Sequence, residues 1–232
     1  SRQEIEELNR PSDLKGFQAL LSTWGMIAAC FALVAWHPAW YMIAFALVIL
    51  GGRHLALAIL MRDCAHYSLF RTPALNDWIG QWLCGNPTWQ DLRRYRPHHL
   101  RHHRYAGSEQ DPDQSLVEGF PLSRASLARK LLRDISGITG VKRVYGQLLM
   151  DLGFIEYTGS SDVKKVPQAG RSLRDVLQMG AKNLHGVVLT NAALFALLAS
   201  LGVGHLYWLW LASYLTTFSV FIRVRSIAEH AM

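Results

Sequence analysis

Three histidines in the middle of the chain have the spacing H-x-x-H-H: His99, His102 and His103. In a helix, residues at i, i+3 and i+4 lie on one face, so the segment after Pro97 predicts three neighbouring imidazoles. Pro97 suits the first turn of that helix, and the Asp-Pro-Asp turn at 111–113 suits its end. Neutral imidazole is a common metal ligand, whereas clustered protonated imidazoles repel one another. We therefore predict a metal site, with a basic, solvated surface stretch as the alternative.

Long uncharged segments must position these histidines. No Lys, Arg, Asp or Glu occurs between Phe17 and Gly52, or between Asn183 and Ile222. A helix needs about 20 apolar residues to cross a bilayer core of about 30 Å. Each uncharged region is long enough for two crossings with a tight turn between them. A soluble protein with two buried hairpins is the alternative, but soluble helices of this length normally carry charged residues on one face.

The predicted fold class is therefore an all-α integral membrane protein with four transmembrane helices in two hairpins. We expect one domain over 1–232, with a first hairpin at 17–61, an interfacial region at 62–182 and a second hairpin at 183–222. Every charged residue then lies on the side that carries the histidines, and the positive-inside rule makes that side cytoplasmic. The expected location is a multi-pass membrane protein, in the cell inner membrane if the source is bacterial.

The net charge of +7 has two interpretations. A basic protein can bind nucleic acid, but the arginines near residues 93–104 lie among the histidines and form no separate patch with stacking aromatics. Anionic lipid headgroups are the simpler partner, so we expect membrane contact and no nucleic acid binding. Apolar residues spaced three and four apart over 124–152 also predict an amphipathic helix with a bend at Gly137 and Gly140. This helix lies on the membrane surface or packs against the domain.

Two more histidines join the central cluster through the predicted topology. His66 follows the second uncharged stretch, and His230 follows the fourth. Both are expected at the membrane depth of the central cluster. His98 is predicted to be a bystander, and His54 to point into the bundle or toward headgroups, although each is an extra ligand candidate. The remaining histidines are expected to be non-ligands: His37, His185 and His205.

These motifs resemble the membrane fatty acid desaturase superfamily. The matching features are the box at 63–66 (Asp-Cys-Ala-His) followed by Leu-Phe at 69–70, the H-x-x-H-H box at 99–103, and Ala-Glu-His at 228–230. Their order between two predicted hairpins extends the resemblance along nearly the whole chain. One H-x-x-H-H box is a moderate signal, and its place in this topology makes it strong.

The resemblance implies a non-haem di-iron centre at the cytosolic face that uses O2 and two electrons to desaturate a fatty acyl lipid. The implied iron ligands are His66, His99, His102, His103 and His230. Four acids could orient the second nitrogen of these imidazoles, or be plain surface carboxylates: Asp63, Asp111, Asp113 and Glu229. The electron donor is expected to be a separate ferredoxin or cytochrome b5, which a basic surface would steer.

Two features depart from the superfamily pattern. Arg62 stands where the first box normally begins with a histidine, and guanidinium is not a usable iron ligand. A further H-x-x-H-H box normally follows the position of His230, whereas this chain stops at Met232. We therefore expect the natural chain to continue beyond residue 232.

Three other functions remain open at this stage. A lipid or carotenoid hydroxylase or ketolase shares the same histidine pattern. A non-catalytic membrane homologue with a degenerate metal site would explain Arg62. A zinc-dependent membrane hydrolase is disfavoured because the sequence has no H-E-x-x-H run.

Overall fold

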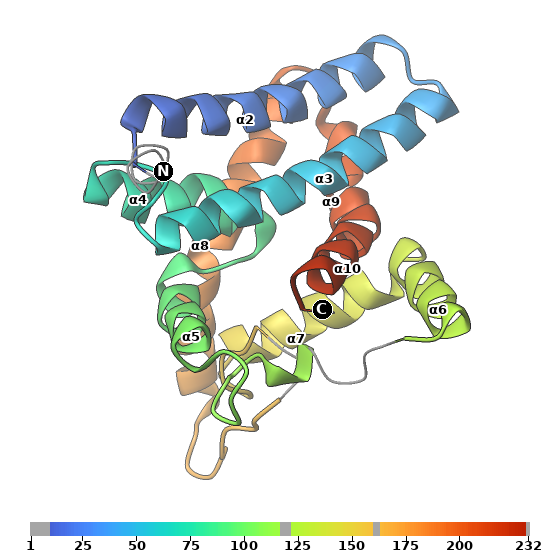
Figure 1. The fold of residues 1–232 in the computed structure, drawn as a ribbon. Coiled ribbons are helices and arrows are strands. Elements are labelled where there is room, and N and C mark those ends of the chain that lie inside the picture. Colours follow the sequence, from blue (N-terminus) through green and yellow to red (C-terminus); the bar gives the residue numbers. More distant parts are fainter. Residues whose placement is uncertain (1–9, 117–121, 160–162, 231–232) are drawn as a thin grey trace, which may run out of the picture.

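The computed structural model describes residues 10–116, 122–159 and 163–230, and its regular structure is helical (Figure 1). The α-helices are α2 (Asp13–Trp36), α3 (Trp40–Ala65), α4 (Pro73–Ile79), α5 (Leu92–Tyr105), α6 (Arg124–Ile135), α7 (Ile138–Asp151), α8 (Leu173–Ser200), α9 (Tyr207–Leu215) and α10 (Thr217–His230). Short π- and 3-10 turns are η1 (Gly80–Gly85), η2 (Asn86–Thr88), η3 (Gln114–Leu116) and η4 (Gly204–Leu206). Strand pairing in the described ranges is limited to one isolated bridge between Ile155 and Lys165. The predicted all-α class is confirmed.

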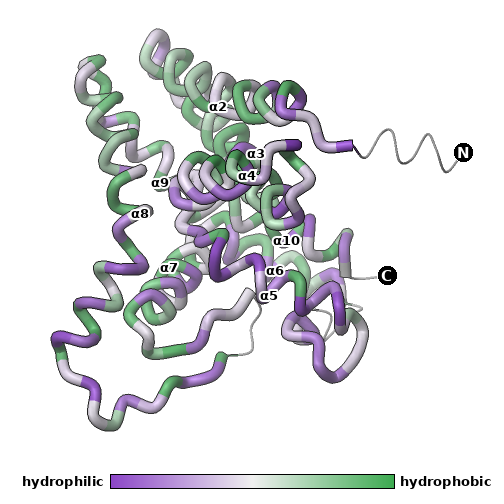
Figure 2. Tube along the Cα trace, turned by 90° about the vertical axis from the view of Figure 1, so that its left-hand side faces the viewer, coloured by the Kyte–Doolittle hydropathy of each residue, from purple (hydrophilic) through white to green (hydrophobic). Residues whose placement is uncertain are grey.

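Three of these helices are long and apolar enough to cross a membrane: α2, α3 and α8. Figure 2 shows apolar residues along α2, α3 and the far end of α8, with hydrophilic residues toward α5 and the connecting loops. The helix α8 starts at Leu173, ten residues before the predicted hairpin boundary, because Ser172 and Asp175 form a capping box there. The helices therefore fit a membrane protein with its polar part gathered at one end.

The segment predicted as a single fourth crossing is divided in two. Helix α9 ends at Leu215, and α10 begins at Thr217 after a break at Thr216 with φ −106° and ψ −89°. The Thr217 hydroxyl donates to the carbonyl of Leu47 in α3 at 2.6 Å. That contact fastens the break to α3, so the uninterrupted helix that the apolar run predicted does not form. The fourth crossing therefore stays a prediction.

The predicted bend in the amphipathic stretch is a complete break. Helices α6 and α7 meet at Gly137, whose φ of 84° favours glycine because other residues are strained there. Gly140 packs directly on Leu215, where an added Cβ would lie 2.0 Å from the backbone oxygen. Asp134, fully buried, pairs with Arg223 of α10. These contacts hold α6 against α10 and α7 against the end of α9.

A buried cluster fixes the end of α3, where the histidine site begins. Leu60, Met61 and Cys64 of α3 pack with Phe70, which is fully buried, and with residues of η1. The side chain of Asn76 binds both the N–H and the carbonyl of Phe70, at 3.1 and 2.7 Å. Burying a phenylalanine side chain contributes about 1.5–3 kcal/mol. The turn after His66 is therefore rigidly held.

Candidate metal centre

Three imidazoles from two helices meet at one point. His66 caps the C-terminus of α3, while His99 and His103 lie one turn apart on α5. The Nε2 atom of His99 lies 3.0 Å from Nε2 of His66 and 3.1 Å from Nε2 of His103. One nitrogen from each of the three residues lies within 4.8 Å of the other two. This is the only group of three such donors in the part of the chain that is described.

Arg96 holds the two helices in this arrangement. Its guanidinium donates to the carbonyls of Ala65 and Cys64, each at 3.0 Å, at the C-terminal end of α3. It also pairs with Asp77 at 2.7 Å and lies over the ring of Tyr67. The last carbonyls of a helix lack intrahelical partners, and a cation suits the negative end of the helix dipole. Arg96 therefore sets α5 against the residue that precedes His66.

Helix α5 begins earlier than the sequence predicted. Asp91 caps it by accepting hydrogen bonds from the N–H groups of Arg93 and Arg94 at 2.9 and 3.4 Å. Pro97 consequently lies inside the helix and not in its first turn. The missing N–H of a proline leaves a carbonyl one turn earlier without its usual partner. The prediction for Pro97 was therefore wrong, although the helical spacing of the histidines that follow it is as expected.

Burial and neighbouring charges keep these imidazoles neutral. Burial, aided by repulsion from His103 and Arg62, lowers the pKa of His99 to about 3. Burial also lowers the pKa of His66 and, together with Arg62, that of His103. The ring of Tyr95 stacks on His99 at a centroid distance of 4.8 Å. Neutral imidazoles with fixed orientations are the form that binds a metal ion.

The crowding around His99 fits a shared cation. Its Nε2 has three nitrogen neighbours within 3.2 Å: one each from His66, His103 and Arg62. A neutral imidazole nitrogen has a single lone pair or a single proton, so it cannot satisfy all three. Two nitrogen ligands of one metal ion are separated by about 3 Å when each bond is about 2.1 Å. The imidazole donor set therefore fits a metal ion.

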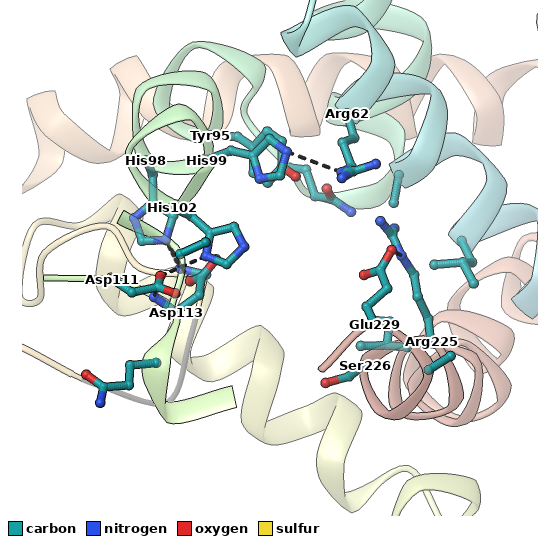
Figure 3. A pocket seen from close by; sticks show the side chains of 18 of the residues that line it. Arg62, Tyr95, His98, His99, His102, Asp111, Asp113, Arg225, Ser226 and Glu229 are labelled. Carbon is teal, nitrogen blue, oxygen red and sulfur yellow. Dashed lines mark hydrogen bonds and ion pairs between the residues drawn. The ribbon is translucent and has the colours of Figure 1, made fainter. Parts of the chain in front are cut away.

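Arg62 is the exception within this site. It donates from Nε to Nε2 of His99 at 3.2 Å, so a permanent positive charge faces the nitrogen expected to bind metal (Figure 3). Arg62 comes from α3, one turn before His66. Its charge opposes a cation at the same place. Arg62 stands at the position where the sequence lacks the expected ligand, and its guanidinium therefore competes with a metal ion for Nε2 of His99.

The ring of His102 lies beside Asp111 and Asp113 (Figure 3), with its centroid 6.1 Å from that of His99 and 5.7 Å from that of His103. Its Nδ1 lies 2.7 Å from Oδ1 of Asp111 and 3.8 Å from Asp113. Burial alone would raise the pKa of Asp111, but the His102 hydrogen bond and the amides of Asp113 and Gly107 lower it overall. Helix α5 ends at Tyr105, so the turn at 111–113 follows a short loop and does not end the helix directly.

The structure separates the other candidate residues. Nε2 of His98 pairs with Asp113 at 3.0 Å. Glu229 pairs with Arg225 at 3.0 Å, and neither it nor Asp63 forms a hydrogen bond or ion pair with a histidine of the described ranges. His54 is fully buried in the bundle, with Nε2 3.1 Å from the Ser213 hydroxyl.

His230 ends α10, and its side chain lies outside the described residues. His37 lies in the exposed turn between α2 and α3, 2.8 Å from the Tyr41 hydroxyl. Nδ1 of His185 donates to the Lys182 carbonyl at 2.7 Å, and its ring is near Trp82. His205 lies in η4, between α8 and α9. Like His54, these three lie outside the imidazole group.

A cavity of about 760 Å³ opens beside the histidines. His98, His99 and His102 line one side, and Arg225 and Glu229 of α10 line the other (Figure 3). The cavity wall also includes apolar side chains, those of Leu55, Phe218 and Ile222. Ligand cavities in proteins typically measure about 300–1,000 Å³. The site can therefore admit a substrate next to His99.

Sequence reasoning missed the residues that support the histidines, chiefly Tyr95 and Arg96. Their spacing from the H-x-x-H-H box could have indicated them, because Tyr95 lies four positions and Arg96 three positions before His99 in the same helix. At those separations, side chains share a helix face. Their partners, such as the Ala65 carbonyl, come from another helix and could not be read from local spacing.

The fold and site together define a helical membrane protein with a histidine-rich centre at one end of its apolar helices. The sequence model of the fatty acid desaturase family matches residues 35–232. The chain belongs to the fatty acid desaturase family, as the histidine boxes predicted.

Two characterised relatives are similar to the chain. A dihydrorhizobitoxine desaturase of Bradyrhizobium elkanii is 25% identical over 231 residues, which cover 98% of this chain and 62% of the relative. An sn-1 acyl-lipid omega-3 desaturase (ferredoxin) of Synechocystis sp. is 32% identical over 91 residues, 39% of this chain and 25% of the relative. The chain thus spans about six-tenths of the length of the first relative.

Proposed function

We propose that this protein is a membrane-bound, O2-dependent desaturase with a histidine-ligated iron centre. The observation that carries the proposal is the meeting of His66, His99 and His103 beside a cavity of about 760 Å³. His102 and His230 are further proposed ligands, which would complete the predicted set of five. The relatives support desaturation, and a lipid or acyl substrate is proposed from the family.

Bound iron would supply the activation of O2. The O2 would accept two electrons from a donor, and two electrons with two protons from two adjacent C–H bonds of the substrate, which becomes a C=C bond; with two further protons from solvent, both oxygen atoms leave as water. The protein's own residues would hold and shield the reacting carbon. Phe218 and Ile222 keep an apolar chain beside His99 and exclude water there. A ferredoxin-type donor is proposed, because one relative carries ferredoxin in its name. We place the histidines at the cytoplasmic face.

Metal content and product mass test this proposal. Purified protein is expected to contain about two iron atoms per chain. Supplied with donor, O2 and a lipid substrate, it should yield a product lighter by two hydrogens. A product heavier by one oxygen would identify a hydroxylase. His66→Ala should lower the iron content, whereas His37→Ala changes an exposed histidine far from the group and should not.

Arg62 supports a second candidate, a non-catalytic member of the family. Its guanidinium already occupies the acceptor nitrogen of His99. This candidate predicts a folded, monodisperse protein that retains no iron after purification under conditions that preserve iron in an active relative. Zinc without iron would support the ligand geometry and contradict the redox role.

A further inference from the structure

A second cavity adjoins the one beside the histidines. Its volume is about 550 Å³, and it lies between α5, α7, α9 and α10. Gln90, Tyr95, Phe218 and Ile222 line both cavities. Tyr95 also stacks on His99, so a single side chain lies between the second cavity and the imidazole group. The two cavities are therefore neighbours that share a wall.

The second cavity contains a positive charge without a matching carboxylate. Arg143, half-buried on α7, lies over the rings of Tyr214 and Phe218 at 4.6 and 4.7 Å. No acidic side chain pairs with it in the described ranges. Arg94, in the same cavity, is different: it pairs with Asp151 at 2.5 Å, and Trp89 donates to the same carboxylate at 2.8 Å.

A structural role explains part of the position of Arg143. The break at Thr216 exposes carbonyls at the end of α9, and Arg143 donates to the carbonyl of Tyr214 and, at 2.9 Å, to the Ser219 hydroxyl. The negative end of the helix dipole offsets part of the positive charge. Guanidinium has five N–H donors, however, and these contacts engage only two nitrogens. A half-buried charge that lacks a full counter-charge favours binding of an anion.

The remaining wall of this cavity is largely apolar. Trp89, Met150, Ile155, Val163 and Val187 line it, together with the shared Phe218 and Ile222. Such walls suit a hydrocarbon or other apolar group. Lys142, Asp91 and the Arg94–Asp151 pair also line the cavity, so its cations outnumber its carboxylates. A cationic end beside apolar walls selects a ligand with an anionic end and an apolar body.

We propose that the second cavity binds the anionic end of an amphiphilic substrate at Arg143, with its apolar part directed past Tyr95 and Phe218 toward the histidines. The anionic group is a carboxylate or a phosphate, since both accept hydrogen bonds from guanidinium. Calling this ligand the substrate rests on the proposed function. Binding itself does not, because Arg143 and the cavity require no metal.

The test measures binding to metal-free, detergent-purified protein. Tritiated decanoate is the probe, and unlabelled decanoate, decyl phosphate, decanol and decyltrimethylammonium compete for its site. The two anions should displace the probe, and the alcohol and the cation should require at least about tenfold higher concentrations. If decanoate displaces the probe and decyl phosphate does not, the anionic end of the ligand is a carboxylate. Stronger displacement by decyl phosphate identifies a phosphate-bearing ligand.

Variants locate the binding site. Arg143→Gln should weaken decanoate binding by about tenfold or more, and Arg143→Lys should restore part of the loss. Arg133→Gln removes an equal charge from an exposed position on α6 and should change binding by less than about twofold. If Arg143→Gln fails to fold, Val187→Phe, which fills the cavity from α8, should abolish binding.

Two results would overturn the proposal. The first is competition by decanol as strong as that by decanoate in the wild-type protein, and the second is unchanged decanoate affinity in folded Arg143→Gln. Either result leaves Arg143 only as the cap of α9. Loss of iron binding with charge-selective decanoate binding intact would instead overturn the proposed function and leave this inference standing.

Discussion

Arg62 donates a hydrogen bond from Nε to Nε2 of His99 across 3.2 Å, so a guanidinium group and a proposed metal ion compete for one nitrogen. The same charge helps to lower the pKa of His99, His66 and His103, although burial is the largest cause for each. This relationship makes Arg62 the residue that most directly governs the proposed centre.

Replacing Arg62 should strengthen metal binding. Arg62→Gln removes the repelling charge, and Arg62→His adds a fourth imidazole next to His66, so we expect affinity gains of about tenfold for the first and more for the second. Chelator competition with Fe²⁺, or with Co²⁺ as a spectroscopic substitute, measures the effect. Arg101→Gln, at an exposed position of α5, is the control. Unchanged metal affinity in both Arg62 variants would show that the Arg62 side chain does not face the bound metal ion.

Arg96 should contribute to the stability of the fold. Arg96→Gln loses the charged contacts to the α3 carbonyls and to Asp77, and we expect the free energy of unfolding to fall by about 2 kcal/mol. Thermal unfolding in detergent measures this change. Arg93→Gln, an exposed neighbour on α5, should leave the melting temperature nearly unchanged. Equal melting temperatures for both variants would contradict the role of Arg96 as the link between the helices.

Asp111 should influence metal affinity through His102. Its carboxylate accepts at 2.7 Å from Nδ1 of His102, which leaves Nε2 as the nitrogen for a metal ion. Asp111→Asn should weaken metal affinity by about tenfold or more if His102 is a ligand. Glu109→Gln, an exposed acid in the same loop, is the matched control. If both variants bind metal like the wild type, His102 has no place among the ligands.

Acidification should destabilise the metal-free protein. The pKa of His99 is about 3 in the fold and about 6.5 in an unfolded chain, so the unfolded state binds a proton that the folded state does not. The stabilising contribution of neutral His99 is present above about pH 6.5 and is lost as the pH falls toward about 3. His66 and His103 act in the same direction. Melting temperatures of the wild type should therefore fall more steeply between about pH 7 and pH 5 than those of His99→Gln. An equal change of melting temperature with pH in the wild type and in His99→Gln would contradict this account.

The sequence by itself determined the helical class and part of the site. Uncharged runs forced the chain between Phe17 and Gly52 into two apolar helices, α2 and α3, because no other backbone satisfies its hydrogen bonds in an apolar medium. The spacing of His99 and His103 placed both on one helix face without any tertiary information. The order of the boxes at 63–66, 99–103 and 228–230 was enough to identify the family.

Only the tertiary structure decided which histidines meet. His102 is one position closer in sequence to His99 than His103 is, yet its Nδ1 pairs with Asp111, whose position depends on the loop that follows α5. The break at Thr216 likewise depends on a hydroxyl contact to Leu47, 170 residues away. That break in turn allows Arg143 to reach the second cavity. Helical periodicity is a local property of the backbone, whereas these contacts depend on how distant segments pack, which local spacing does not encode.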